Sequence, residues 1–462
     1  MTRSVTINPP KMCQPMGAIL AYMGVHGCVP LVHGSQGCST YPRYNIARHF
    51  RESAEVAVSS LAEDAAVYGG AKNLTEAIKN IKSRLAPEAI GICTTCMSET
   101  IGDDVKLISK KALQGELESV TIFPASTPSY VGTHLTGYDN ALRTLVETLT
   151  VKSLIVNDAT KGESNNRIDN NKIDKINNNK INIITGVINP GDIREIKNML
   201  RLMNVQSIFL SDISDTLDSP ILPGGHKPLL PEGGTKLVDI VDSINSLGTV
   251  AICRTAGSAA VYLKNKFNVP AVLDPAPIGV TNTDKFVKNI SRLSGVPIPH
   301  EIVIERGRLI DSMVDVHHYM FGRKVAIFGD PDIVSAIVRF CAETGMNPTV
   351  AMTATKQKDF ASDIKAINSE YKTDTQILEG TDLYEFHKVV KTHGAELIIG
   401  NSKGKDIADD ENIPIVRVGF PVYDRVGVYR YPIMGYNGSI YLLDQMTNAI
   451  LGHKYDPDKL HQ

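Results

Sequence analysis

The feature that most constrains the fold is a repeated alternation of short apolar runs with longer amphipathic runs. The amphipathic run PDIVSAIVRFCAETG (331–345) has the signals of a complete helix, with proline in its first turn and glycine just beyond its end. The strand-like apolar runs include INIITGVI (181–188), VQSIFL (205–210), GTVAICRT (248–255), KVAIFGD (324–330) and PTVAMTA (348–354). Short strands that alternate with helices form parallel sheets covered on both faces, so the pattern predicts an α/β fold.

The chain has 462 residues, which is too long for one ordinary hydrophobic core. Residues 157–180 are mostly Asn, Asp and Lys, and such a segment cannot bury enough apolar surface to fold alone. We interpret it as a polar linker or insertion. The prediction is therefore three doubly wound, Rossmann-like domains with parallel sheets: an N-terminal domain over 1–156, a second α/β domain over 181–300 and a third over 301–462.

Charge and hydropathy exclude several classes of partner. A formal net charge of −2 gives no electrostatic footprint for nucleic acid or for an anionic membrane surface. The sequence contains no apolar run long enough to span a bilayer, and its start, MTRSVTINPP, lacks the apolar core of a signal peptide. We therefore expect a cytoplasmic protein that binds neither nucleic acid nor membrane.

Three segments of the first domain place Cys or Ser just after a predicted strand. LVHGSQGCSTYPR (31–43) is predicted to run from a strand into a glycine turn, with a helix from about Tyr44 to Glu52. EAIGICTTCMSETIGDD (88–104) is predicted to open from a strand into a loop, and FPASTPSYVGTHLTGYDN (123–140) to lead into a helix from about Asp139. Ligands of open parallel sheets collect at the carboxyl ends of strands, so these loops are candidate binding elements.

The seven cysteines do not all suit the same role. A buried thiol is usually a small apolar side chain, and we interpret Cys28, Cys253 and Cys341 in that way. Cys93 and Cys96 form a CxxC pair, but a zinc site would need a second pair at suitable spacing, and the sequence has none. Alternation along the strand turns Cys93 toward the core. Considered one at a time, the same interpretation as a buried thiol would apply to Cys13, Cys38 and Cys96.

The order of four segments changes that interpretation. NPPKMCQPMGA (8–18), VHGSQGC (32–38), TTCMSETIGDD (94–104) and TPSYVGTHLTGY (127–138) resemble, in this order, the signature segments of β subunits of the nitrogenase component 1 family. The resemblance runs nearly end to end. It implies that Cys13, Cys38 and Cys96 ligate an 8Fe-7S P-cluster shared with an α subunit.

The resemblance also implies that Ser129 joins this cluster when the cluster is oxidised. Iron–sulfur clusters are held by thiolates, and three cysteines instead of four suggest that another chain completes the ligand set. A thiolate needs compensating positive charge or N–H donors, and Gly34 and Gly37 let the backbone approach the Cys38 sulfur. An alkoxide at Ser129 would be a harder ligand than thiolate and would couple electron loss to proton loss.

Two residues after Cys38 match positions beside the cluster in the family. These are Tyr41 and Arg43, and a buried Arg43 would balance the charge of a thiolate-rich cluster. The alternative for Arg43 is an ordinary solvated helix face. Pro42 departs from the aromatic residue that is more usual in the family, so packing beside the cluster is expected to differ.

A second set of residues suggests a mononuclear metal site. Asp311 and Asp315 are four residues apart, so a helix would place both carboxylates on one face. The family resemblance implies a metal between two β subunits, with Glu52 and the Arg51 carbonyl from one chain and these aspartates from the other. Oxygen ligands suit a hard ion such as iron or calcium. The alternative is a solvated acidic helix face.

The segment SLAEDAAVYGG (60–70) resembles the surface on which the reductase partner docks. Tyr68 takes the place of an aromatic residue in that surface, and an exposed aromatic is a common interface hot spot. Its alternative is ordinary core packing.

The resemblance implies an α2β2 enzyme. An ATP-driven iron protein would deliver electrons through the P-cluster to an iron–molybdenum cofactor in the α subunit, where N2 is reduced to NH3. No catalytic residue is expected in this chain. Two other functions stay open: the β-like subunit of the non-catalytic scaffold on which the cofactor matures, and the β subunit of a vanadium or iron-only nitrogenase. HGSQGC and TTCMSE are closer to the molybdenum form, whereas the full set of cysteines and Ser129 favours the enzyme over the scaffold.

Overall fold

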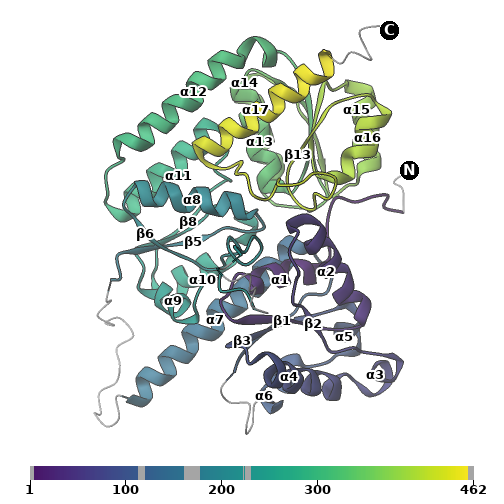
Figure 1. The fold of residues 1–462 in the computed structure, drawn as a ribbon, viewed down its shortest axis with the longest axis vertical. Helices are drawn as coiled ribbons and strands as arrows, with labels where there is room; N and C mark the ends of the chain where they lie inside the picture. The colour runs from purple at the N-terminus through teal and green to yellow at the C-terminus, as the bar shows by residue number, and fades with distance from the viewer. Residues whose placement is uncertain (1–4, 113–119, 161–176, 222, 224–229, 456–462) are drawn as a thin grey trace.

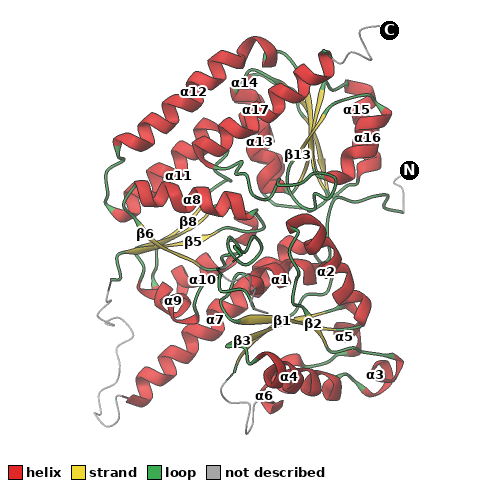
Figure 2. Ribbon diagram, viewed as in Figure 1, coloured by secondary structure: helices red, strands yellow, loops and turns green. Residues whose placement is uncertain are grey.

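The computed structural model describes residues 5–112, 120–160, 177–221, 223 and 230–455 of the chain. Three parallel β-sheets follow one another along the sequence, and helices cover both faces of each sheet (Figure 1, Figure 2). In the view of Figure 1 the first sheet lies at the lower right, the second at the left and the third at the top. This arrangement confirms the predicted α/β class with three doubly wound parallel sheets.

The first sheet has the strand order β2-β1-β3-β4. Its strands are β1 (Cys28–His33), β2 (Ala57–Val58), β3 (Ala89–Thr94) and β4 (Thr121–Ala125). Alternate residues face opposite layers: Val29 and Leu31 pack toward one group of helices, and Cys28 and Val32 toward the other. The helices of this part are α1 (Gln14–Met23), α2 (Gln36–Phe50), α3 (Glu63–Tyr68), α4 (Ala71–Leu85), α5 (Cys96–Ile101), α6 (Val105–Ala112) and α7 (His134–Thr160).

The second sheet has the order β6-β5-β7-β8 and the third the order β11-β10-β9-β12-β13. The second part contains β5 (Lys180–Ile184), α8 (Pro190–Leu202), β6 (Gln206–Phe209), α9 (Leu237–Asp242), η1 (Ser243–Asn245), β7 (Gly248–Ala251), η2 (Arg254–Ala256), α10 (Ser258–Phe267), β8 (Ala271–Leu273) and α11 (Gly279–Ser294). The third part contains α12 (His300–Met320), β9 (Lys324–Gly329), α13 (Pro331–Glu343), β10 (Asn347–Thr353), α14 (Phe360–Tyr371), β11 (Gln376–Glu379), α15 (Leu383–His393), β12 (Leu397–Gly400), η3 (Ser402–Gly404), α16 (Lys405–Asp410), β13 (Ile415–Arg417) and α17 (Gly435–Lys454).

The strands predicted from apolar runs are all present, but two helix starts were wrong. Helix α2 begins at Gln36 and not near Tyr44, and it contains Pro42 in its interior. Helix α7 begins at His134 and not at Asp139. Gly and Pro are poor helix formers, so these segments looked like loops; tertiary packing outweighs that propensity here.

The polar segment 157–180 is only partly described. Helix α7 continues through Thr160, so the first four residues of the segment are helical. Residues 161–176 lie outside the described residues, and strand β5 begins at Lys180. None of the described helices combines the length and the apolarity needed to cross a membrane.

Helices α1 and α7 cross in unusually close contact, and this crossing sets the position of the chain just before α1. At the crossing, Gly17 faces the backbone of α7 directly. A Cβ atom at Gly17 would overlap the carbonyl oxygen of His134. Only glycine lets two backbones approach this closely, so Gly17 fixes the position of α1 against α7.

His49, at the end of α2, joins all three parts of the chain. It is completely buried, its Nδ1 accepts a hydrogen bond from the Val422 amide (2.8 Å), and its Nε2 lies 2.8 Å from the Asn189 carbonyl oxygen Oδ1. Burial lowers the pKa of His49 to about 4, although both hydrogen bonds oppose this shift. The side chain is therefore neutral in the folded protein.

Acidification is expected to destabilise the protein through His49. In the unfolded chain this histidine gains a proton below about pH 6.5, whereas the folded protein resists protonation down to about pH 4. The contribution of neutral His49 to the free energy of unfolding is therefore fully present above pH 6.5. It is lost as the pH drops toward 4, and the loss is about 3 kcal/mol at most. His49→Gln should lack this loss. Thermal unfolding of the parent and the variant is measured between pH 4.5 and 7.5, and the difference between their stabilities removes the effect of the other titrating groups. If the stabilities of the two proteins fell in parallel with pH, the role of His49 would be contradicted.

Candidate metal centre

The candidate site lies at the carboxyl edge of the first sheet. His33, the last residue of β1, pairs with Thr94, the last residue of β3, and Cys93 pairs with Ala125 at the end of β4. The strand order reverses between β1 and β3, and such a switch point is where open α/β sheets bind ligands. The segments that follow these three strand ends carry Cys38, Cys96 and Ser129.

Each of the three candidate cysteines lies at the start of a helix. Cys13 is the N-cap residue of α1, Cys38 is in the first turn of α2, and Cys96 is the first residue of α5. The expectation that Cys38 and Cys96 lie in loops after the strands was therefore wrong. Free N–H groups and the helix dipole favour negative charge at the start of a helix, which is where a metal-bound thiolate would place it.

Hydrogen bonds fix the backbone around Cys13. The amide of Met12 donates to His134 Nδ1 (3.3 Å), and the amide of His134 donates to the Met12 carbonyl oxygen (3.0 Å). The amide of Gln14 donates to Ser129 Oγ (3.0 Å). Ser129 therefore lies directly beside the start of α1, next to Cys13.

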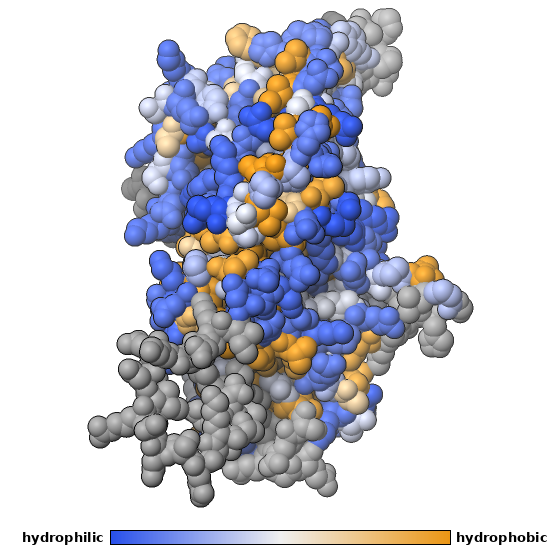
Figure 3. Space-filling model, turned by 90° about the vertical axis from the view of Figure 1, so that its left-hand side faces the viewer, coloured by the Kyte–Doolittle hydropathy of each residue, from blue (hydrophilic) through white to orange (hydrophobic). Residues whose placement is uncertain are grey.

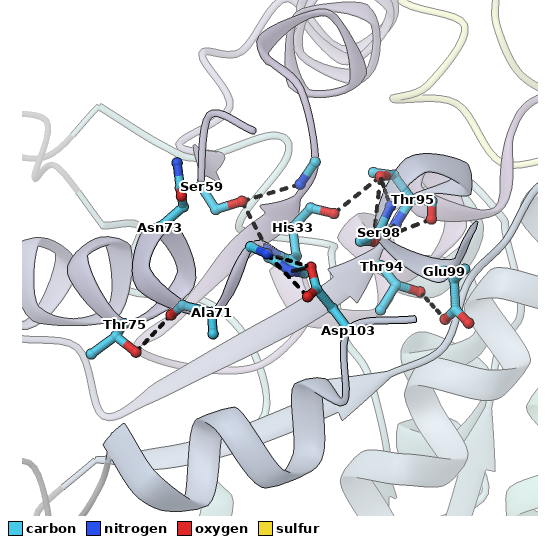
Figure 4. Close-up of polar contacts among 12 residues, drawn as sticks. His33, Ser59, Ala71, Asn73, Thr75, Thr94, Thr95, Ser98, Glu99 and Asp103 are labelled. Carbon is cyan, nitrogen blue, oxygen red and sulfur yellow. Dashed lines mark hydrogen bonds and ion pairs between the residues drawn. The ribbon is translucent and has the colours of Figure 1, made fainter. Parts of the chain in front are cut away.

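Side-chain hydrogen bonds also tie the three strand ends together. Thr95 Oγ1 donates to the His33 carbonyl oxygen (3.1 Å), as Figure 4 shows. The Thr127 amide donates to Thr94 Oγ1 (2.7 Å), and Thr127 Oγ1 donates to the Thr94 carbonyl oxygen (2.6 Å). These bonds hold the segments that carry Cys38, Cys96 and Ser129 in one unit.

The electrostatics at Cys13 fit a thiolate site that needs a cationic partner. Burial raises the pKa of Cys13, and the neighbouring Cys38 and Cys96 raise it further, while the Met16 amide lowers it. Cys38 and Cys96 are therefore both close enough to Cys13 to disfavour its thiolate. A bound metal cluster would remove that effect, so the donor set fits an iron–sulfur cluster.

The site opens toward the surface of the chain. Cys96 is exposed, and Cys13 and Cys38 are half-buried. Among the described residues, no three His, Cys, Asp or Glu side chains converge closely enough to hold one metal ion.

The structure does not bring the second set of predicted ligands together within one chain. Arg51 is the C-cap of α2 and Glu52 follows it, whereas Asp311 and Asp315 lie on α12, in a different part of the molecule (Figure 1). Both aspartates are exposed and four residues apart on the helix, as expected from their spacing. A site that uses all four residues would need two chains.

The remaining predicted site residues are all exposed. Tyr41 is 45% exposed, and its hydroxyl donates to Met12 Sδ (3.1 Å), beside Cys13. Burial of part of its ring, and then Cys13, raise the pKa of Tyr41. Arg43 is exposed on α2. Tyr68 is 88% exposed at the end of α3, which argues against the core-packing alternative.

The other four cysteines are buried, which confirms their interpretation as core side chains. Cys28, Cys93, Cys253 and Cys341 are each at most 7% exposed. Burial raises the pKa of Cys28 to about 12 and also raises the pKa values of Cys93, Cys253 and Cys341. None of the four therefore has the character of a ligand.

Sequence reasoning missed a buried polar network behind the site (Figure 4). His33 Nδ1 lies 2.9 Å from Ser59 Oγ, and His33 Nε2 lies 3.0 Å from Asp103 Oδ2. Both His33 and Asp103 belong to the signature segments but are not ligands. The one signal in the sequence was a histidine at the carboxyl end of an otherwise apolar strand.

The fold and the site together define a class of protein. Its members have three units built on parallel sheets, and a group of thiols lies at the switch point of the first sheet. The family model for nitrogenase component 1 type oxidoreductases matches residues 13–451. The chain therefore belongs to the nitrogenase component 1 family, and within it to the β chains.

Individual relatives support this membership. The molybdenum–iron protein β chain of Methanococcus maripaludis is 45% identical over 98% of this chain and 96% of its own length. The vanadium–iron protein β chain of Trichormus variabilis is 41% identical over 98% of this chain and 96% of its own length. An iron–iron protein β chain from Rhodobacter capsulatus also aligns, at 37% identity over 97% of this chain and 94% of its own.

A solved structure titled "Nitrogenase Cp1 at pH 6.5" has the same fold. It superposes with a TM-score of 0.91 at 38% identity, over 99% of this chain and 96% of the other. The chain is thus a subunit of a nitrogenase, and β chains of all three metal classes are similar to it.

Proposed function

We propose that this chain is the β subunit of a molybdenum nitrogenase and that it holds half of an 8Fe-7S P-cluster. The observation that carries the proposal is the grouping of Cys13, Cys38 and Cys96 on three helix starts, open on one side. The bound cluster would accept and release electrons. The role of this chain is to hold and orient the cluster, while dinitrogen is reduced at the iron–molybdenum cofactor of the α subunit.

The rim of the site supports a shared cluster. Apolar and aromatic side chains are exposed directly after Ser129: Tyr130 is 63% exposed and Val131 70%. Exposed aromatic groups around an open thiol site favour a protein interface over solvent. We therefore propose that an α subunit covers this face and supplies the remaining ligands, in an α2β2 assembly within the cytoplasm.

Ser129 is proposed as a fourth, conditional ligand. Its Oγ accepts a hydrogen bond from the Gln14 amide, and this bond would stabilise an alkoxide. Tyr41 and Arg43 are proposed to line the same cluster.

A second metal site is proposed between two β subunits. Arg51 and Glu52 of one chain would meet Asp311 and Asp315 of the other around a mononuclear iron or calcium ion. Helix α12 also exposes Val303, Ile304, Ile310 and Val314, and Phe321 is exposed at its C-cap. Figure 3 shows apolar side chains among polar ones on the side of the molecule that bears this helix. This mixture of apolar groups and paired carboxylates suits a contact between chains.

Tyr68 is proposed to dock the iron protein, and its removal should weaken docking selectively. Tyr68→Ala should raise the apparent KM for the iron protein at least about tenfold, as loss of an aromatic hot spot does. Iron content should stay that of the parent. Tyr455→Ala removes another exposed tyrosine, at the end of α17, and serves as the matched control. An unchanged KM in Tyr68→Ala would contradict the docking role.

Two alternatives keep the fold but change the role. The non-catalytic scaffold paralogue would not need Cys13, Cys38, Cys96 and Ser129 together, and their grouping favours the enzyme. A vanadium or iron-only nitrogenase would need the same β-chain site, since the distinguishing metal lies in the α subunit.

One experiment distinguishes these functions. The chain is purified with its native α partner under strict anaerobiosis, and iron, molybdenum and vanadium are measured. A molybdenum nitrogenase should contain iron and molybdenum and reduce dinitrogen with the iron protein and ATP. A complex with vanadium, or with iron alone, would assign the chain to another class, and a complex without P-cluster iron would favour the scaffold.

A further inference from the structure

A chain of buried polar groups links the segment after the exposed helix α3 to the segments that carry the thiols. Figure 4 shows its central members, His33, Ser59 and Asp103. At its centre His33 is completely buried, between Ser59 Oγ (2.9 Å) and the Asp103 carboxylate (3.0 Å). Burial lowers the pKa of His33, so the ring is neutral. An ionised carboxylate only accepts hydrogen bonds, so Nε2 carries the proton and Nδ1 accepts from the Ser59 hydroxyl.

On the outer side, Asp103 is tied to the end of α3. Its two carboxylate oxygens accept hydrogen bonds from the Gly70 amide, at 3.0 and 3.1 Å. A Cβ atom at Gly70 would lie 2.6 Å from Asp103 Oδ2 and 2.8 Å from His33 Cε1, so only glycine fits this junction. Gly70 follows Tyr68 by two residues, and α3 buries only Ala65. The helix therefore buries little of its own surface, and the carboxylate holds the chain just after it, at the N-cap of α4.

On the inner side, His33 is tied to both cysteine segments. Its carbonyl oxygen accepts a hydrogen bond from Thr95 Oγ1 (3.1 Å), and Thr95 is the N-cap of the helix that starts with Cys96. Ser59 Oγ accepts from the Gly34 amide (3.2 Å), at the turn that leads to Cys38. Helix α3 also packs directly on α5. A movement of α3 must therefore move the Cys96 segment or break these bonds.

We propose that Asp103 and His33 are positioning residues that transmit the docking of the reductase at Tyr68 to the segments carrying Cys38 and Cys96. The proposal rests on the proposed function, in which Tyr68 docks the reductase and the thiols hold a cluster. It adds that docking adjusts the thiol site mechanically, through one carboxylate and one neutral imidazole. A network that only stabilised the fold would not respond to docking.

The test is hydrogen–deuterium exchange on the assembled complex, with and without saturating reductase. In the parent protein, docking should slow exchange in residues 61–72 and also in residues 94–101, each at least about fivefold, the lower end of usual coupling between sites. In Asp103→Asn the carboxylate is replaced by an isosteric amide, whose NH2 group then faces at least one of the two donors, the Gly70 amide and His33 Nε2. Docking should then slow exchange in 61–72 but no longer in 94–101.

Two further variants separate coupling from folding. Gly70→Ala adds a methyl group between Asp103 and His33 without removing any polar group. In this variant, too, docking should slow exchange in residues 61–72 only. Glu411→Gln removes the acid of another histidine–carboxylate pair, with His387 in the third part of the chain (2.6 Å), and should respond like the parent.

Two outcomes would overturn the coupling. The first is a parent protein in which docking slows exchange in 61–72 alone, and the second is Asp103→Asn and Gly70→Ala responding like the parent. In both, docking itself would still stand. If docking left 61–72 of the parent unchanged, the docking surface of the proposed function would fail as well.

Discussion

Replacing Cys96 with alanine is expected to remove P-cluster iron from the assembled complex and to lower reductase-driven activity by more than about 100-fold. Changes to groups that only support a metal ligand already cost about 10–100-fold, and loss of the ligand itself costs more. Cys96 is exposed at the first position of α5, so the substitution leaves no buried cavity. Iron analysis and the P-cluster redox signal, measured beside activity, attribute the loss to the cluster.

The matched control for this prediction is Cys93→Ala, only three residues earlier. Cys93 is completely buried on β3 and faces the core. Its removal should cost about 1 kcal/mol of stability through lost packing and leave the iron content intact. Full iron and full activity in Cys96→Ala would show that the ligand assignment is wrong.

Replacing Gly17 with alanine is expected to cost at least about 3 kcal/mol of stability, the upper range for overpacked cores. The added methyl group would overlap the His134 carbonyl oxygen, which belongs to the backbone of α7 and cannot rotate away. Helix α1 would have to move, and Cys13 at its N-cap would move with it. The variant should therefore unfold at a lower temperature and bind less iron than the parent.

Gly452→Ala is the control for that substitution. Gly452 is also helical, in α17, and no atom lies within 4 Å of the position its Cβ would take. Its replacement should change stability by no more than about 1 kcal/mol, in the favourable direction that helix propensity predicts. If Gly17→Ala were as stable as this control, the close crossing of α1 and α7 would not be what holds Cys13.

The periodicity of the sequence was sufficient to predict the three sheets. Strands such as β1 and β3 are buried on both faces and read as continuous apolar runs, which is the strongest signal a parallel sheet can give. The helix starts at Gln36 and His134 were not predictable in the same way, because Gly37, Pro42 and Gly137 oppose local helix formation. Packing between distant segments decides these positions.

The candidate cysteines could be proposed from sequence only because four segments resemble a family in the right order. Spacing alone could not bring Cys13 to Cys38 and Cys96, since their proximity depends on how α1 crosses α7 and on the pairing of β1 with β3. The His33–Asp103 pair could not be predicted for the same reason, because its two residues are distant in sequence. A histidine on a strand is also usually a core residue whose hydrogen bonds are already made.

The most direct test of a shared cluster at this site is an anomalous difference map at the iron absorption edge, from crystals of the anaerobic α2β2 complex. The proposed function requires a strong multi-iron peak at the boundary between the subunits, bonded to the sulfur atoms of Cys13, Cys38 and Cys96. A map with no iron at these three sulfurs, in a complex that is active, would contradict it.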